Sequence, residues 1–307
     1  MTEYNKLCKY LIYIFLLLYL VLNSIFLTEF PFVHSDESWL SGLSRDILEK
    51  RTFSTTESFF DLYPRNPHAI KIFFHTIQAT VIHTLGYTIF NMRFISLIFG
   101  VLTLLVFYKL IHQLFHSLWL SVISVVILAL DIQFIYASHF ARQEIILLFI
   151  FMTAITINMV HLDDLSLKHV MITGILMGIS IGMHPNSFII AIPFGLLYGY
   201  QFFFRKKTIK LPLLYIVLLS IFASAFIAIS LSFNADYLSD YGSYGSDLGV
   251  TQSLFEKATQ LKYYLLKLYY GISGTYYTPD IRFQFVLFLI AALAALYYCF
   301  KETHTHL

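Results

Sequence analysis

Residues 94–113 form a long apolar stretch, FISLIFGVLTLLVFYKLIHQ, in which Lys109 is the one side chain charged at pH 7. A helix needs roughly 20 mostly apolar residues to cross the hydrocarbon core of a bilayer, and this stretch has that length and composition. Further stretches of the same kind are 10–29, 117–136, 144–160, 168–184, 188–204, 211–232 and 283–300. The sequence therefore predicts an all-α polytopic bundle of about eight transmembrane helices.

The overall composition also indicates a membrane protein. Hydrophobic residues make up 58% of the chain and charged residues 12%, whereas soluble domains carry about 25% charged residues. Lipid must therefore cover part of the surface. The net charge of +2 indicates no nucleic-acid partner. We expect residues 1–307 to form one integral membrane domain, with membrane lipid as a constant partner.

Two segments, 68–86 and 252–271, mix charged and apolar residues at helical spacing. Amphipathic helices of this kind suit the membrane interface, so we expect both to lie flat, in the first and last outer loops. The basic run Arg205-Lys-Lys207 then falls on the cytoplasmic side with the N-terminus, as the positive-inside rule requires. This topology predicts a multi-pass protein of the plasma membrane. Its predicted extracytoplasmic segments are 30–93, 137–143, 184–187 and 233–282.

Adjacent carboxylates, Asp36 and Glu37, follow the first apolar stretch within the motif His34-Ser-Asp-Glu-Ser-Trp39. At a membrane surface they could act as a general base and as a carboxylate that orients a substrate or a metal. The alternative is a solvated helix start, with Asp or Ser capping a helix over residues 37–50.

A proline-bounded turn, Tyr63-Pro-Arg-Asn-Pro-His68, leads into the first amphipathic segment. Arg65 and His68 could contact a phosphate there. The alternative is a plain helix start marked by proline.

Three ionisable residues, His139, Arg142 and Glu144, lie close together at the start of an apolar stretch. Ionisable groups at such a depth are costly and tend to be functional. The alternative is an internal ion pair between Arg142 and Glu144. Asp131, expected inside the helix over 117–136, is a further site candidate, unless it pairs with Arg142 or His139.

His184 stands in the outer turn Met183-His-Pro-Asn-Ser187. It could ligate a metal or carry a proton, or the turn could serve only to connect two helices. On the helix before it, Gly174, Gly178 and Gly182 form a ridge of small residues that would let a neighbouring helix approach closely.

The order of these motifs resembles the GT-C class of lipid-dependent glycosyltransferases. Protein O-mannosyltransferases, lipid A aminoarabinose transferases and related bacterial polytopic glycosyltransferases have a similar arrangement. The resemblance is strongest over residues 30–205. It rests on Asp36-Glu37 opening a long outer loop, Asn66-Pro67 before an amphipathic helix that ends at Gly86, Arg93 starting the second spanning helix, Arg142 with Glu144, and His184-Pro185-Asn186.

The resemblance implies transfer of a sugar from a polyprenyl-phosphate donor to a glycan, lipid or protein acceptor at the extracytoplasmic face. Asp36 would be the base or would orient the acceptor, with Glu37 and Glu144 as supporting carboxylates in the catalytic set. Arg142 would neutralise the donor phosphate. The remaining predicted substrate-binding residues are His139, His184, Asn66, His68 and Arg65.

Some relatives place an acidic residue and a lysine before paired prolines, where this chain has Tyr63-Pro-Arg-Asn-Pro-His68. The resemblance therefore leaves a divalent metal cofactor open. Relatives also continue with further helices or a C-terminal soluble domain, which we expect to be absent from a GT-C-like core over about 10–300. The alternative functions are a non-catalytic membrane scaffold and a transporter of lipid or small molecules.

Overall fold

The computed structural model describes residues 3–55, 69, 71–184, 187–247, 253, 255–257, 259 and 282–305. These residues form helices and loops and contain no strand, which confirms the all-α class. The helices are α1 (Glu3–Phe26), α2 (Ser35–Lys50), α3 (Ile72–Leu85), α4 (Ile89–Phe115), α5 (Leu118–Leu130), α6 (Ile132–His139), α7 (Glu144–Val160), α8 (Leu167–Ile181), α9 (Ser187–Phe203), α10 (Lys210–Phe233), α11 (Tyr237–Asp247) and α13 (Arg282–Thr305).

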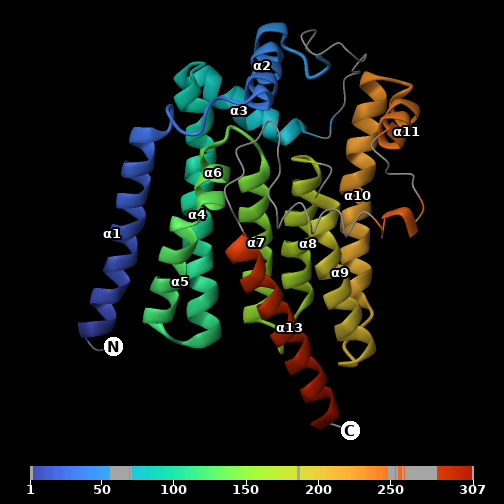
Figure 1. Ribbon diagram of the computed structural model, residues 1–307. Coiled ribbons are helices and arrows are strands. Elements are labelled where there is room, and N and C mark those ends of the chain that lie inside the picture. Colours follow the sequence, from blue (N-terminus) through green and yellow to red (C-terminus); the bar gives the residue numbers. More distant parts are fainter. Residues whose placement is uncertain are drawn as a thin grey trace. The chain divides into compact units, whose positions relative to one another are not determined.

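Contacts divide the chain into two units, Met1–Asp240 and Tyr241–Leu307. In the first unit, α4 packs against α7, and α8 packs against α10. Figure 1 shows that the N-terminus lies at the same end of this unit as the turns that follow α4, α7 and α9. Helices α2 and α3 lie at the opposite end, together with the connections after α6 and α8. In the second unit, α13 is the long helix that the structure describes.

Length and composition qualify α4 and α10 as membrane spans. Helices α5 and α6 together form a candidate span that is bent by 66°. Shorter apolar helices are Tyr10–Phe26, Ile72–Leu85, Glu144–Val160, Leu167–Ile181, Ser187–Phe203 and Phe285–Ala294. The helical membrane-bundle class is thus confirmed, and a count of eight spans stays a prediction. The second predicted amphipathic segment, 252–271, lies almost entirely outside the described residues.

The structure corrects the prediction of one continuous helix over 117–136. The chain breaks at Asp131, which ends α5 and caps α6. The Asp131 carboxylate accepts a hydrogen bond from the Phe134 backbone N–H at 3.0 Å. A short acidic side chain competes for nearby backbone amides and so favours a helix start over a helix interior. Asp131 therefore serves as a cap of α6. Among the described residues it forms no ion pair with Arg142 or His139, which was the alternative to a role in the site.

The glycine ridge on α8 lies directly against α10. A Cβ atom added at Gly174, Gly178 or Gly182 would collide with a side chain of α10. The facing side chains are Leu218, Phe222 and Phe226, respectively. The missing Cβ atoms let the two helices approach closely, as the spacing of the glycines predicts.

Gly178→Ala should destabilise the protein, because its new methyl group would overlap the Phe222 ring and overpacking costs about 1–3 kcal/mol. Gly199→Ala on α9 is the matched control, since nothing lies within 4 Å of its added Cβ. Alanine favours a helix over glycine by about 1 kcal/mol, so the control should be neutral or stabilising. Thermal unfolding in detergent measures both, and equal midpoints for the two variants would contradict the close approach.

Candidate active site

The first turn of α2 separates the two adjacent carboxylates. His34 caps the helix: its Nδ1 accepts from the Asp36 backbone N–H at 3.1 Å, and Glu37 Oε1 accepts from the His34 backbone N–H at 3.0 Å. The helix therefore begins at Ser35 with a histidine cap, instead of at residue 37 with an Asp or Ser cap. Successive helical residues point about 100° apart. Glu37 consequently points into the protein, whereas Asp36 remains partly exposed.

Glu37 forms a buried ion pair with Arg93, the fifth residue of α4. Arg93 donates from Nε and Nη2 to the two carboxylate oxygens at 2.9 and 2.8 Å. Its Nη1 donates to the carbonyl oxygens of Leu27 and Pro31. Glu37 Oε2 also accepts from the Ala141 backbone N–H at 2.9 Å. The pair thus joins α2 and α4 to the connections that follow α1 and α6.

A second, partly exposed group of charges lies beside this pair. Arg142 Nη1 is 3.0 Å from Asp36 Oδ2, and Arg142 Nη2 is 2.6 Å from Glu144 Oε1. The side chains of Asp36 and Glu144 are 33% and 47% exposed. One cation therefore bridges two carboxylates that a ligand can reach. The Arg142–Glu144 ion pair, which the sequence left open as an alternative, is present, and Arg142 also contacts Asp36.

His184 and Lys71 add to this group. Burial, followed by the positive charges of Lys71 and Arg142, lowers the pKa of His184 to about 4. The Phe73 backbone N–H donates to the Gly182 carbonyl oxygen at 3.0 Å, which fixes the start of α3 beside the end of α8. The Lys71 ammonium also lies 4.9 Å from the centre of the Trp39 ring. The site therefore has a neutral imidazole near two cations.

A family model for dolichyl-phosphate-mannose-protein mannosyltransferases matches residues 70–230, which is 161 of the 307 residues of the chain. The chain belongs to this family. Membership confirms the resemblance seen in the sequence. It identifies the chain as a membrane glycosyltransferase that uses a lipid-linked sugar as its donor. No curated protein and no solved structure gives a significant match to it.

The family match includes Arg93, Arg142, Glu144 and His184 but begins after Asp36 and Glu37. In this mannosyltransferase-family protein the two carboxylates at the start of α2 contact the matched segment: Glu37 pairs with Arg93, and Asp36 pairs with Arg142. The side chains of this group come from α2, from the connection between α6 and α7, from the start of α7, and from the connections before α3 and after α8.

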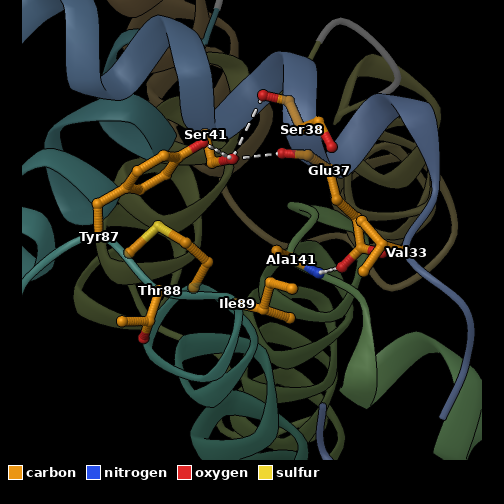
Figure 2. Close-up of a pocket in the computed structure, with 9 residues that line it drawn as sticks. Val33, Glu37, Ser38, Ser41, Tyr87, Thr88, Ile89 and Ala141 are labelled. Atoms are coloured by element: carbon orange, nitrogen blue, oxygen red, sulfur yellow. Dashed lines mark hydrogen bonds between the residues drawn. The ribbon is translucent and has the colours of Figure 1, made fainter. Parts of the chain in front are cut away.

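A cavity of about 180 Å³ lies on another side of Glu37 (Figure 2). The residues that line it are Val33, Glu37, Ser38, Ser41, Tyr87, Thr88, Ile89, Met92 and Ala141. Figure 2 shows the Ser41 hydroxyl between Tyr87 and the backbone of α2; it donates to the Glu37 carbonyl oxygen at 2.6 Å and lies 3.0 Å from the Tyr87 hydroxyl. Asp36 is not among the lining residues, so this hydroxyl-rich cavity is separate from the exposed charges.

His139, predicted to bind substrate, is buried. Its Nδ1 lies 2.9 Å from the Phe30 carbonyl oxygen and its Nε2 lies 2.9 Å from Asn23 Oδ1. Both ring nitrogens therefore contact groups of α1 and of the loop after it. We leave His139 out of the proposed substrate-binding residues, because these contacts hold α6 against α1.

Several residues that shape the site carried no clear signal in the sequence. Arg93 entered the resemblance only as the start of the second spanning helix, and its carboxylate partner Glu37 was not predicted. Lys71 marked only the polar side of an amphipathic segment. Ser44 donates to Gln78 Oε1 at 2.7 Å and lies 2.9 Å from His75 Nδ1. This buried cluster joins α2 to α3, and nothing in the local sequence pairs its members.

Three predicted substrate-binding residues, Arg65, Asn66 and His68, lie outside the described residues. Within the part of the chain that the structure describes, no group of three or more His, Cys, Asp or Glu side chains is placed to hold a metal ion. The ionisable side chains of the described group are Asp36, Arg142, Glu144, Lys71 and His184.

Glu37→Gln should destabilise the fold strongly, because it leaves the buried Arg93 charge without its carboxylate. Breaking one partner of a buried pair typically costs about 3–5 kcal/mol. Glu49→Gln, an exposed position on the same helix, should change stability by less than about 1 kcal/mol. Chemical or thermal unfolding in detergent compares the two variants. Equal stability of both would show that the pair does not hold this end of the bundle.

His184 should make stability fall as the pH is lowered from 6.5 towards 4. In this window the unfolded chain binds a proton at His184, while the folded chain, with its pKa lowered to about 4, does not. His184→Gln removes this proton uptake, so the wild type should lose more stability on acidification than the variant does. Unfolding midpoints at several pH values measure the difference, and parallel curves would contradict the lowered pKa.

Proposed function

We propose that the chain transfers a sugar from a polyprenyl-phosphate donor, with the reaction taking place around Asp36, Arg142 and Glu144. The observation that supports this most directly is the Arg142 bridge between two partly exposed carboxylates. Sugar transfer needs a base for the acceptor hydroxyl and a cation for the departing phosphate. Both groups stand in contact at one end of the bundle, where a lipid tail can remain in the bilayer.

Asp36 is the proposed base, because both carboxylate oxygens of Glu37 already accept hydrogen bonds within the protein. Both Glu37 oxygens accept hydrogen bonds from Arg93, and they also accept from the backbone N–H groups of His34 and Ala141. Asp36 is partly exposed and could accept the proton of an acceptor hydroxyl. Glu37 would support the reaction by holding α2 in place.

Arg142 is the proposed contact of the donor phosphate. In the described structure two carboxylates neutralise it, so an incoming phosphate would compete with them. Glu144 is the more exposed of the two and would be displaced more readily. Release of Asp36 from Arg142 would leave a carboxylate oxygen available to the acceptor. Donor binding and the activation of the acceptor would thereby be linked.

Lys71 and His184 complete the proposed site. Lys71 supplies a second positive charge, which a departing polyprenyl phosphate needs as its own negative charge develops. The lowered pKa of His184 keeps its imidazole neutral near pH 7, so it can donate one hydrogen bond and accept another. We place this end of the bundle at the extracytoplasmic face of the plasma membrane, because the positive-inside rule puts Arg205-Lys-Lys207 on the cytoplasmic side.

Asp36→Asn should lower the turnover number by about 10²- to 10⁴-fold, the usual contribution of a positioned base. The side chain keeps its size, so the fold should survive. Asp46→Asn is the matched control: Asp46 lies on the same helix and pairs with Lys50, away from Arg142. The measurement is release of polyprenyl phosphate from polyprenyl-phosphate-linked mannose in membranes that contain the protein and its native acceptors. Undiminished release by a folded Asp36→Asn protein would remove Asp36 from the mechanism.

A further inference from the structure

The turn between α9 and α10 carries the densest positive charge in the sequence. We name residues 203–210, Phe-Phe-Arg-Lys-Lys-Thr-Ile-Lys, the basic turn. It lies at the end of the first unit opposite α2 and α3 (Figure 1). Lys206 adopts the left-handed backbone conformation, with φ of 55°. The proposed reaction uses none of these residues.

The basic turn is held in a defined position by its neighbours. Lys207 Nζ donates to the Asp163 carbonyl oxygen at 3.0 Å, and the Lys207 backbone N–H donates to the Gln201 carbonyl oxygen at 3.0 Å. Gln201 Nε2 in turn donates to the Leu162 carbonyl oxygen at 3.3 Å. These bonds fix the turn against the connection between α7 and α8. A fixed set of cations can bind a ligand with less loss of conformational entropy than a mobile loop.

Three cations of the basic turn, Arg205, Lys206 and Lys210, are exposed. Among the residues that the structure describes, no carboxylate forms an ion pair with any of them. The connection between α7 and α8 adds Asp163 and Asp164, and Lys168 follows in the first turn of α8. Asp164 lies 3.2 Å from His161. With the histidines left out, the basic turn and this neighbouring segment together carry five positive and two negative charges. The surface therefore attracts anions.

Exposed apolar side chains border these cations. Phe203, Phe204 and Ile209 are all exposed within the basic turn. The Phe204 ring stacks on that of Tyr200, with centroids 5.3 Å apart. Aromatic side chains beside basic ones are typical of the headgroup level of a membrane. Large apolar side chains, including Leu196 on α9 and Leu213 on α10, continue the exposed surface away from the turn.

We propose that the basic turn binds the phosphodiester headgroup of an anionic membrane lipid, with Arg205, Lys206 and Lys210 as its contacts. The headgroup charge would neutralise cations that the described chain leaves without carboxylates. The acyl chains would lie along the exposed apolar side chains of α9 and α10. A soluble polyanion fits less well, because the exposed side chains of Phe203, Phe204 and Ile209 place the cations at the level of the lipid headgroups. This binding site is independent of the proposed sugar transfer.

The test is native mass spectrometry of the full chain in detergent, titrated with phosphatidylglycerol or phosphatidylcholine. The wild type should bind its first phosphatidylglycerol more tightly than its first phosphatidylcholine. Each basic residue near a lipid surface contributes roughly fivefold to affinity, so Arg205→Gln with Lys206→Gln should weaken phosphatidylglycerol binding on the order of 25-fold. Binding of phosphatidylcholine should be unchanged.

A double variant with Lys50→Gln and Arg51→Gln is the matched control. It removes the same number of charges from the end of another helix, and Arg51 has the left-handed backbone conformation of Lys206. The control should bind both lipids as the wild type does, and thermal unfolding should show that both double variants are folded. An equal loss in the control would reduce the effect to net charge and overturn the site. Competition by inorganic phosphate as strong as that by the lipid would overturn the choice of a lipid ligand.

Discussion

The buried ion pair between Glu37 and Arg93 is the constraint on which the site end of the bundle depends. Taking both charges out of water is costly, and the cost is offset only when the remaining hydrogen-bonding atoms also find partners. Here they do: the pair contacts the carbonyl oxygens of Leu27 and Pro31 and the backbone N–H groups of His34 and Ala141. Four separate parts of the chain must therefore reach their places together.

The pair also explains how two adjacent carboxylates come to differ. Asp36 and Glu37 are consecutive helical residues, so their side chains point in different directions. Glu37 points inward and forms the ion pair with Arg93 of α4. Asp36 is left at the surface, where Arg142 meets it. Because Glu37 also binds the Ala141 backbone N–H, the residue next to Arg142 is held by the same carboxylate. The buried pair of Glu37 and Arg93 thus helps to place the partly exposed side chains of Asp36 and Arg142 beside each other.

Local sequence was enough to predict the helical bundle and the α8 glycine contact, because periodicity determines them. It offered the Arg142–Glu144 pair as one of two interpretations, because the two residues are close in the chain. It did not predict the Arg93 partner, the Ser44–His75–Gln78 cluster or the Asp36–Arg142 contact, since these join residues that are distant in the chain. The break at Asp131 was missed for another reason: the apolar residues on either side continue the pattern of a span. The hydrogen bond from the Phe134 N–H to the Asp131 carboxylate marks the break.

The break at Asp131 has a consequence for the surrounding bilayer. Helix α5 has 13 residues and so rises about 20 Å, some 10 Å less than a typical hydrocarbon core. The chain then turns by 66° into α6. The helix is therefore interrupted at Asp131, before α5 has risen far enough to cross the hydrocarbon core. A break of this kind is tolerated where neighbouring protein or water covers it, or where the bilayer thins beside it. In each case the chain reaches Arg142 through α6, without one straight helix across the full hydrocarbon core.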